Sequence, residues 1–241
     1  MIRTYTIDRP HVRNALDLAT IDAIAAMLVD PARVFVLTGA GEKVFCSGAD
    51  LAEVAGSPEG RRDAARRYAR LLGRISACER PVVARVNGHC LAGGMGLLLA
   101  CDLAVAADDV TFSLPEAAVG MWPMMVGAYL LRTVPRKVAM ELAMTGRKLT
   151  AAEAHAYGLV NRVVPRAELD GAVAELTASL LRQSPSALKL GKRAWRDALD
   201  RPLDDGLGLL AERLGDLMAT EDAAEGFVAF LQKRAPEWKD R

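Results

Sequence analysis

The sequence predicts an α/β domain in which helices cover a sheet of parallel character and a helical region follows. Nearly continuous apolar, β-branched runs at 33–39, 81–88 and 102–109 are typical of buried strands. The segment 60–79, whose apolar residues recur at helical spacing, separates the first two runs and gives a strand–helix–strand order. From residue 126 onward the pattern is helical, with breaks at prolines and glycines.

Composition limits the class of protein further. The 241 residues are 51% hydrophobic, enough for one large domain, and the net charge of +1 offers no basic surface for nucleic acid or an anionic membrane. The N-terminus lacks a signal-peptide apolar region and no uncharged stretch is long enough to span a bilayer, so we expect a cytoplasmic protein. Four cysteines at 46, 78, 90 and 101 show no metal-site spacing and predict small buried thiols, with no metal.

Two segments share one pattern, an apolar strand followed by a glycine-containing turn and a helix. They span residues 34–54 and 82–102, and the second contains Gly88, Gly93, Gly94 and Gly96. Such turns leave backbone N–H groups unpaired at a helix start, and two adjacent turns can direct one N–H each at the same carbonyl oxygen. Alternatively, the glycines only permit close packing of helix on strand.

The sequence matches the motifs of nucleotide-binding proteins and hydrolases poorly. "GAGEKV" begins like a dinucleotide fingerprint, but Val44 stands where its last glycine belongs. The sequence has no G-x-S-x-G, no G-x-x-x-x-G-K-[ST] and no H-E-x-x-H. Rossmann, α/β-hydrolase, P-loop and zincin interpretations are therefore not supported.

Glu116 is the candidate acid/base. It follows Pro115 at a predicted helix start, where an acidic residue also complements the helix dipole. Apolar residues surround it in the sequence: Phe112, Leu114, Val119, Met121, Trp122, Met124 and Met125. An apolar environment disfavours the ionised carboxylate, which raises its pKa and suits it to proton transfer. Of the three histidines, His11, His89 and His155, only His89 adjoins a glycine turn.

Five segments taken together, in this order, resemble the crotonase superfamily of enoyl-CoA hydratases and isomerases. They are "RPHVRNAL", "VFVLTGAGEKVFCSGADL", "RPVVARVNGHCLAGGMGLLLACDLAVAADDVTFSLPE", "LTAAEAHAYGLVNRVVP" and "FLQKRAPEWKDR". The resemblance implies a ClpP/crotonase fold of repeated ββα units with a helical C-terminal region. It also implies an acyl-CoA thioester as substrate, an enolate-like intermediate and no cofactor beyond the coenzyme A of the substrate.

The resemblance assigns roles to individual residues. The two oxyanion N–H groups fall on Ala49 and Gly93, and Gly88 and Gly94 would let the backbone approach the thioester. The turn from Ser47 through Gly48, Ala49 and Asp50 to Leu51 corresponds to the family's coenzyme A cradle, with Arg13 and Ala15 as further contacts.

One departure from the family pattern bears on the reaction. Hydratases of the two-acid type carry a glutamate three residues after the oxyanion glycine, where this chain has Gly96. One carboxylate suffices to move a proton from C2 to C4, so the pattern favours a double-bond shift over hydration, with Glu116 as the single acid/base. Met124 replaces the aspartate of the dienoyl-CoA isomerase and dehalogenase branches. Hydration through another water-activating group, or acyl-CoA binding without catalysis, remain alternatives.

The C-terminal helices predict an assembly. Residues 1–185 form the expected core with the acyl-CoA site, and residues 186–241 form an amphipathic helical region that in the resembling family supports trimerisation. We therefore expect a homotrimer or a hexamer.

Overall fold

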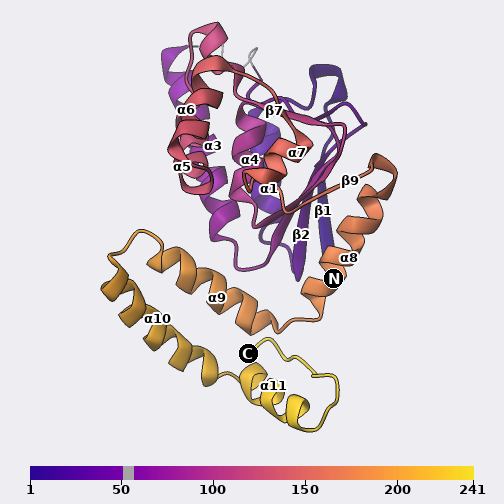
Figure 1. The fold of residues 1–241 in the computed structure, drawn as a ribbon, viewed down its shortest axis with the longest axis vertical. Coiled ribbons are helices and arrows are strands. Elements are labelled where there is room, and N and C mark those ends of the chain that lie inside the picture. The colour runs from indigo at the N-terminus through magenta and orange to yellow at the C-terminus, as the bar shows by residue number, and fades with distance from the viewer. Residues whose placement is uncertain (51–56) are drawn as a thin grey trace.

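The computed structural model describes residues 1–50 and 57–241 (Figure 1). In this part of the chain, five strands form one sheet in the order β1-β2-β4-β6-β9, and every neighbouring pair is parallel. The strands are β1 (Ile2–Ile7), β2 (Val34–Gly39), β4 (Val82–Val86), β6 (Leu103–Ala107) and β9 (Arg162–Val164). The parallel sheet predicted from the three apolar runs is confirmed.

Both faces of a parallel sheet need cover, which explains the continuous burial of its central strands. All six residues of β2 are buried. Helix α8 (Leu169–Leu181) packs on β2, β4 and β6, and α1 (Leu18–Met27) packs on β1 and against α3 (Pro58–Ala77). Figure 1 shows α1 and α8 on the two sides of the sheet.

A second, smaller sheet has the order β3-β5-β7-β8 in the described residues. Its strands are β3 (Val44–Cys46), β5 (His89–Leu91), β7 (Thr111–Ser113) and β8 (Leu149–Thr150), of which only β8 runs antiparallel to its neighbour. The consecutive pairs β2/β3, β4/β5 and β6/β7 each give one strand to each sheet. The expectation of repeated strand pairs in a crotonase-like fold is confirmed.

The chain between β4 and β6 packs its glycines against β3. A Cβ added at Gly88 would lie 2.4 Å from the Val44 nitrogen, and one added at Gly94 would lie 2.3 Å from the Cys46 carbonyl oxygen. Both distances are far below a real Cβ contact, so these positions require glycine for strand packing. Strand packing therefore explains these two glycines, and the expectation that they let the backbone approach a thioester stays a prediction.

Short helices lie between the strands and before α8. They are α4 (Gly93–Ala100), α5 (Met124–Thr133), α6 (Arg136–Thr145), α7 (Ala151–Ala156) and the 3-10 turns η1 (Pro10–Val12), η2 (Pro115–Val119) and η3 (Arg166–Glu168). The strands β8 and β9 lie in the region predicted to be helical. Each has at most three residues, too few to show an alternating pattern.

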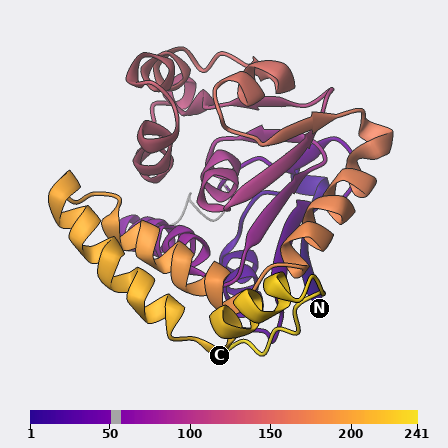
Figure 2. The same cartoon turned by 60° about the horizontal axis from the view of Figure 1, so that its bottom comes forward.

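Helices α9 (Pro185–Ala198), α10 (Leu203–Met218) and α11 (Glu221–Leu231) form an arm beside the body (Figures 1 and 2). The Ser184 side chain caps α9 by accepting from the Ala187 N–H, as the Ser-Pro sequence predicts. α9 begins at Pro185, next to the predicted boundary at 185/186, and the division into two regions stays a prediction.

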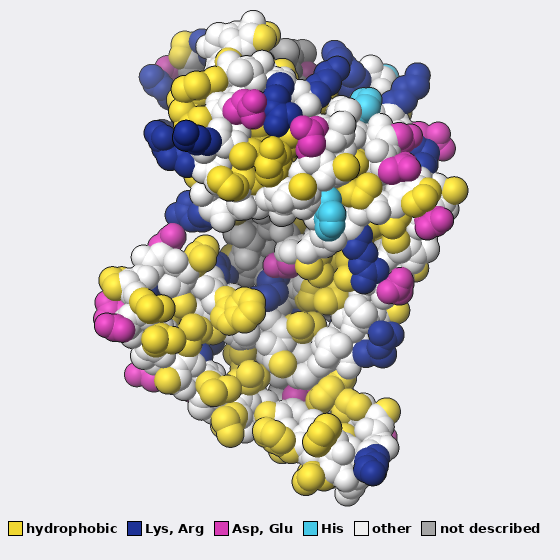
Figure 3. Space-filling view, in the orientation of Figure 1, with side chains coloured by type: hydrophobic (Ala, Val, Ile, Leu, Met, Phe, Trp, Pro, Cys, Tyr) yellow, Lys and Arg dark blue, Asp and Glu magenta, His cyan; other side chains and the backbone are white. Residues whose placement is uncertain are grey.

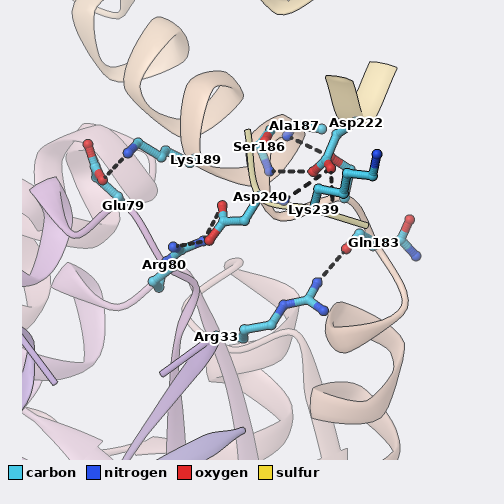
Figure 4. Close-up of polar contacts among 11 residues, drawn as sticks. Arg33, Glu79, Arg80, Gln183, Ser186, Ala187, Lys189, Asp222, Lys239 and Asp240 are labelled. Carbon is cyan, nitrogen blue, oxygen red and sulfur yellow. Dashed lines mark hydrogen bonds and ion pairs between the residues drawn. The ribbon is translucent and has the colours of Figure 1, made fainter. Parts of the chain in front are cut away.

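Polar contacts join this arm to the body (Figure 4). Arg80 forms two hydrogen bonds with Asp240, Lys189 pairs with Glu79 at 2.8 Å, and Arg33 donates to the Gln183 carbonyl at 2.7 Å. Among the described helices, none combines the length and apolar character needed to cross a membrane.

Candidate active site

The two glycine turns meet at their backbones. A Cβ added at Gly48 would lie 2.8 Å from the Gly93 nitrogen, and one added at Gly93 would lie 3.2 Å from the Gly48 Cα. Gly48 also has φ +95°, a conformation that favours glycine. The turn after β3 and the start of α4 are thus in contact, as the repeated strand–turn–helix pattern predicts.

The Ala49 N–H points away from Leu16, the residue with which Ala49 forms a β-bridge. Leu16 and Ala49 form a parallel bridge in which the Leu16 N–H donates to the Gly48 carbonyl at 2.7 Å and the Asp50 N–H donates to the Leu16 carbonyl at 2.9 Å. This pattern leaves the Ala49 N–H on the other side of the segment. Ala49 is exposed, and its N–H has no acceptor among the described residues.

The Gly93 N–H is the first of helix α4 and has no partner within the helix. The preceding residue, Ala92, has φ 47° and no capping side chain. Its strained backbone is held from both sides, because the Ala92 N–H donates to the Ser113 carbonyl at 3.0 Å and the Ala92 carbonyl accepts from the Met95 N–H at 2.9 Å. Within residues 1–50 and 57–241, no acceptor bonds the Gly93 N–H.

The pairing of β5 with β7 brings Glu116 to the same place. Leu91 is the register partner of Ser113, so η2 starts beside the turn that precedes Gly93. Glu116 is 8% exposed, and its Oε2 atom is buried without a hydrogen-bond partner in the described chain. Burial raises the pKa of the Glu116 carboxyl, which the backbone N–H of the same residue only partly opposes.

The apolar surroundings of Glu116 are asymmetric. Phe112 and Leu114, which precede it in the sequence, are fully buried. Val119, Met121, Trp122 and Met124 are all exposed, at 65, 44, 41 and 69%. The large apolar side chains that follow Glu116 in the sequence are therefore exposed on this chain.

The segments predicted to hold coenzyme A come together through the Leu16–Ala49 bridge. Arg9 reinforces that contact, because its Nη1 donates to the Ala15 carbonyl at 2.8 Å and pairs with Asp50 at 2.9 Å. The sequence analysis missed Arg9, whose ion pair spans 41 positions of sequence.

The remaining residues of the predicted coenzyme A segments differ in accessibility. Arg13 is exposed with φ 58°, Ser47 is half-buried and Gly48 is buried. Leu51 lies outside the described residues.

Tyr68 is a site residue that the sequence analysis also missed. Its hydroxyl donates to the Gly93 carbonyl at 2.5 Å, from helix α3. No local motif marks it, because the contact depends on how α3 packs on α4.

His89, by contrast, forms its hydrogen bond with Thr111. Its Nδ1 accepts from the Thr111 N–H at 3.0 Å, and its side chain is exposed.

Two main-chain donors beside a buried, unpartnered carboxylate define a class of site. Neighbouring N–H groups stabilise a carbonyl oxygen that gains negative charge, and a carboxylate with a raised pKa transfers protons. The arrangement suits an acyl group whose carbonyl oxygen gains negative charge during a reaction. Comparison with known proteins identifies the family.

The enoyl-CoA hydratase/isomerase family model matches residues 1–241. A carnitinyl-CoA dehydratase of Salmonella typhi is 37% identical over 247 aligned positions, which cover 98% of this chain and 94% of that protein. The crystal structure of an enoyl-CoA hydratase from Bacillus anthracis superposes with a TM-score of 0.95 at 34% identity, covering 100% of this chain and 96% of the other. The crystal structure of a human enoyl-CoA hydratase domain-containing protein superposes with a TM-score of 0.92 at 34% identity, covering 98% of this chain and 96% of the other. The chain belongs to the enoyl-CoA hydratase/isomerase family of the crotonase superfamily.

Proposed function

We propose that this enzyme shifts a carbon–carbon double bond in an acyl-CoA thioester, with Glu116 as its single acid/base. The observation that carries the proposal is the buried, unpartnered Oε2 of Glu116 beside the Gly48–Gly93 contact. Relatives in the family act on acyl-CoA substrates by name, which supports a thioester in this site.

The Ala49 and Gly93 N–H groups have the role of oxyanion donors. Neither has an acceptor in the described chain, and both lie in backbone that is held in place, one by the Leu16 bridge and the other by the Ser113 contact. Such preorganised donors stabilise an oxyanion because they need no reorganisation during the reaction. A thioester oxygen between them would place C2 of the acyl chain toward Glu116.

The proposed reaction conserves atoms and electrons. The Glu116 carboxylate takes a proton from C2 of a 3-enoyl-CoA, and the electron pair of that C–H bond becomes part of a dienolate whose charge rests on the thioester oxygen. The protonated Glu116 then delivers the proton to C4, and the electron pairs move to form the C2–C3 double bond. One carboxylate completes the cycle, and Gly96 supplies no second one.

A second candidate reaction is the addition or elimination of water at C3. It is favoured by the names of the relatives, carnitinyl-CoA dehydratase at 37% identity and enoyl-CoA hydratase at 34%. This chemistry requires a group that activates water or protonates the leaving hydroxide in addition to Glu116. A polar side chain that reaches Gly93 is the Tyr68 phenol, whose hydroxyl donates to the Gly93 carbonyl.

Coenzyme A would lie along the segments joined by the Leu16–Ala49 bridge. We assign Arg13, Ala15, Ser47, Gly48, Ala49, Asp50 and Leu51 to this subsite, on the family resemblance and on the bridge that brings the two segments together. The exposed guanidinium of Arg13 suits a phosphate contact.

The proposed assembly is a homotrimer or hexamer. Figure 3 shows hydrophobic side chains gathered over the C-terminal helices. Large side chains there are exposed, among them Trp195 at 76%, Leu203 at 77% and Phe230 at 81%. Apolar surface of this extent is typical of a contact between subunits.

Product analysis tests the proposal. The protein is incubated separately with 3-enoyl-CoA and 2-enoyl-CoA in water enriched in heavy oxygen, and the products are identified by mass spectrometry. We expect 2-enoyl-CoA without heavy oxygen from the first substrate. A labelled 3-hydroxyacyl-CoA as the main product would establish hydration instead, and no turnover with intact binding would indicate an acyl-CoA-binding protein.

A further inference from the structure

The space beside Gly96 is filled by Tyr68. A Cβ added at Gly96 would lie 2.0 Å from the Tyr68 hydroxyl oxygen, 3.2 Å from its Cζ and 3.3 Å from a methyl carbon of Leu72. The first distance is about half of an ordinary van der Waals separation. No side chain larger than hydrogen can occupy position 96 while Tyr68 keeps its place.

Two sets of contacts hold Tyr68 in this position, one at its hydroxyl and one along its helix. Its hydroxyl donates to the Gly93 carbonyl at 2.5 Å, and the next turn of its helix is anchored by Leu71, Leu72 and Ile75, each 1% exposed. Gly93 and Gly96 are three positions apart, so they share one face of α4, and the phenol covers that face. A Cβ added at Gly93 would lie 3.4 Å from the same hydroxyl oxygen.

The phenol is a neutral hydrogen-bond donor in this position. Burial raises the pKa of Tyr68 well above its ordinary value, and the nearby Cys46, Cys90 and Glu116 raise it further. Tyr68 therefore remains protonated where Glu116 is ionised, and its proton is directed at the Gly93 carbonyl. A protonated phenol cannot act as the base that activates a water molecule.

We propose that Tyr68 is a specificity-determining residue: it occupies the volume in which a second carboxylate and an attacking water would stand. With that volume closed, the proton that Glu116 removes from the substrate returns to carbon, and water does not reach C3. Gly96 is the matched partner of Tyr68, since only glycine leaves room for the phenol. This inference rests on the proposed double-bond shift.

Two variants of Tyr68 separate the volume of the side chain from its hydroxyl. Tyr68→Phe keeps the ring and loses the bond to Gly93, whereas Tyr68→Ala opens the volume above Gly96. Each is given 3-enoyl-CoA and 2-enoyl-CoA in heavy-oxygen water, and the ratio of hydrated to isomerised product is measured. We expect the ratio to rise about tenfold or more in Tyr68→Ala and to stay within about twofold of wild type in Tyr68→Phe.

Tyr129→Ala is the control for general loosening. This tyrosine is on α5 and its hydroxyl contacts that of Ser76 on α3 at 3.1 Å, whereas the Tyr68 hydroxyl donates to the Gly93 carbonyl. We expect its product ratio to match that of wild type. A rise in Tyr129→Ala equal to that in Tyr68→Ala would overturn the inference, as would an unchanged ratio in folded Tyr68→Ala.

The wild-type product separates the two proposals. If wild type isomerises and Tyr68→Ala hydrates no more than wild type does, only the role of Tyr68 is overturned. If wild type already hydrates as its main reaction, the proposed double-bond shift fails first.

A thermal measurement tests the Tyr68–Gly96 pairing without activity. Gly96→Ala is expected to lower Tm by about 4 °C or more in the wild-type background, because the added methyl meets the phenol. In the Tyr68→Ala background the same change should leave Tm unchanged or raise it, because alanine favours a helix over glycine. Where Tyr68→Ala does not fold, Tyr68→Leu replaces it in both experiments. Equal losses of Tm in the two backgrounds would contradict the pairing.

Discussion

Two buried carboxylates in this molecule have opposite environments. Glu116 is 8% exposed and Asp222 is 1% exposed, so both have been removed from water. Their pKa values nevertheless move in opposite directions, upward for Glu116 and downward for Asp222. The difference lies in the hydrogen bonds that each carboxylate accepts.

Asp222 is surrounded by donors at the junction of α9, α11 and the C-terminal segment (Figure 4). It accepts from the N–H groups of Lys239 at 2.7 Å, Asp240 at 3.1 Å and Ser186 at 3.3 Å, and from the Ser184 hydroxyl at 2.9 Å. Burial alone would raise the pKa of Asp222, but these bonds, led by the one from Lys239, outweigh it.

The comparison teaches that burial alone does not give a carboxylate its role. A buried carboxylate with several donors stabilises the ionised form and ties segments of the chain together. One whose oxygen accepts no hydrogen bond from the described residues, as at Glu116 Oε2, is less stabilised when ionised, which favours proton exchange with a substrate. Asp222 is therefore structural, whereas the environment of Glu116 supports the proton-transfer role that we propose for it.

The largest expected effect follows from replacing Glu116. Glu116→Gln keeps the shape of the side chain and removes the proton-accepting oxygen, so kcat should fall by about 10³-fold. Acyl-CoA affinity, measured by calorimetry, should change little, and Tm should not fall because no partner is lost. Retention of more than a tenth of wild-type kcat would show that another group carries the proton.

Gly48→Ala tests the contact between the two turns. The added Cβ would lie 2.8 Å from the Gly93 nitrogen and displace this proposed oxyanion donor, so we expect kcat to fall by about 10²-fold. Gly41→Ala is the matched control, because Gly41 also has positive φ but nothing lies within 4 Å of its added Cβ. Equal losses of kcat in the two variants would attribute the effect to backbone strain.

Asp222→Asn should destabilise the fold without removing chemistry. The amide cannot satisfy four donors as a carboxylate does, and we expect the free energy of unfolding to fall by about 2 kcal/mol in denaturant titrations. The loss should appear above the ordinary aspartate pKa of 3.8 and vanish as pH falls through the lowered native pKa, where wild-type Asp222 is protonated. A loss independent of pH would contradict the role of the charge.

The pH dependence of turnover reports on Glu116. The ionised form is the proposed base, so kcat/KM should rise with pH about tenfold per unit below the native pKa and then level off. Because burial raises that pKa above the ordinary 4.5, the midpoint of this limb should lie above pH 4.5. The residual activity of Glu116→Gln should lack this limb, and a wild-type limb that persists in the variant would assign it to another group.

His89→Ala should have the smallest effect. Its Nδ1 accepts from Thr111 and its side chain is exposed, so we expect kcat to change by less than about twofold. A loss of tenfold or more would place His89 in the catalytic machinery.

Much of the site could be predicted because its parts are local in sequence. Gly48 and Ala49 follow one strand, Gly93 follows another, and Glu116 follows a proline at the start of a turn. Residues fixed by a strand end keep their place when strands pair, so a linear pattern is enough to assign them.

The parts that could not be predicted depend on contacts between distant segments. Tyr68 reaches Gly93 across 25 positions, and that contact, rather than any motif, explains why position 96 is glycine. Gly88 and Gly94 show the same limit, since a glycine-rich turn is compatible with ligand approach and with strand packing. Only the position of β3 shows that strand packing requires them.

A direct titration of the two carboxyl groups tests the central claim. That claim is that Glu116 is suited to proton transfer because its Oε2 accepts no hydrogen bond from the described residues. Protein labelled at the side-chain carboxyl carbons is followed by NMR across the acidic range, with Glu116→Gln and Asp222→Asn assigning the two signals. We expect the Glu116 midpoint above 4.5 and the Asp222 midpoint below 3.8. A Glu116 midpoint at or below 4.5 would contradict the account, because it would mean that the folded protein stabilises the carboxylate after all.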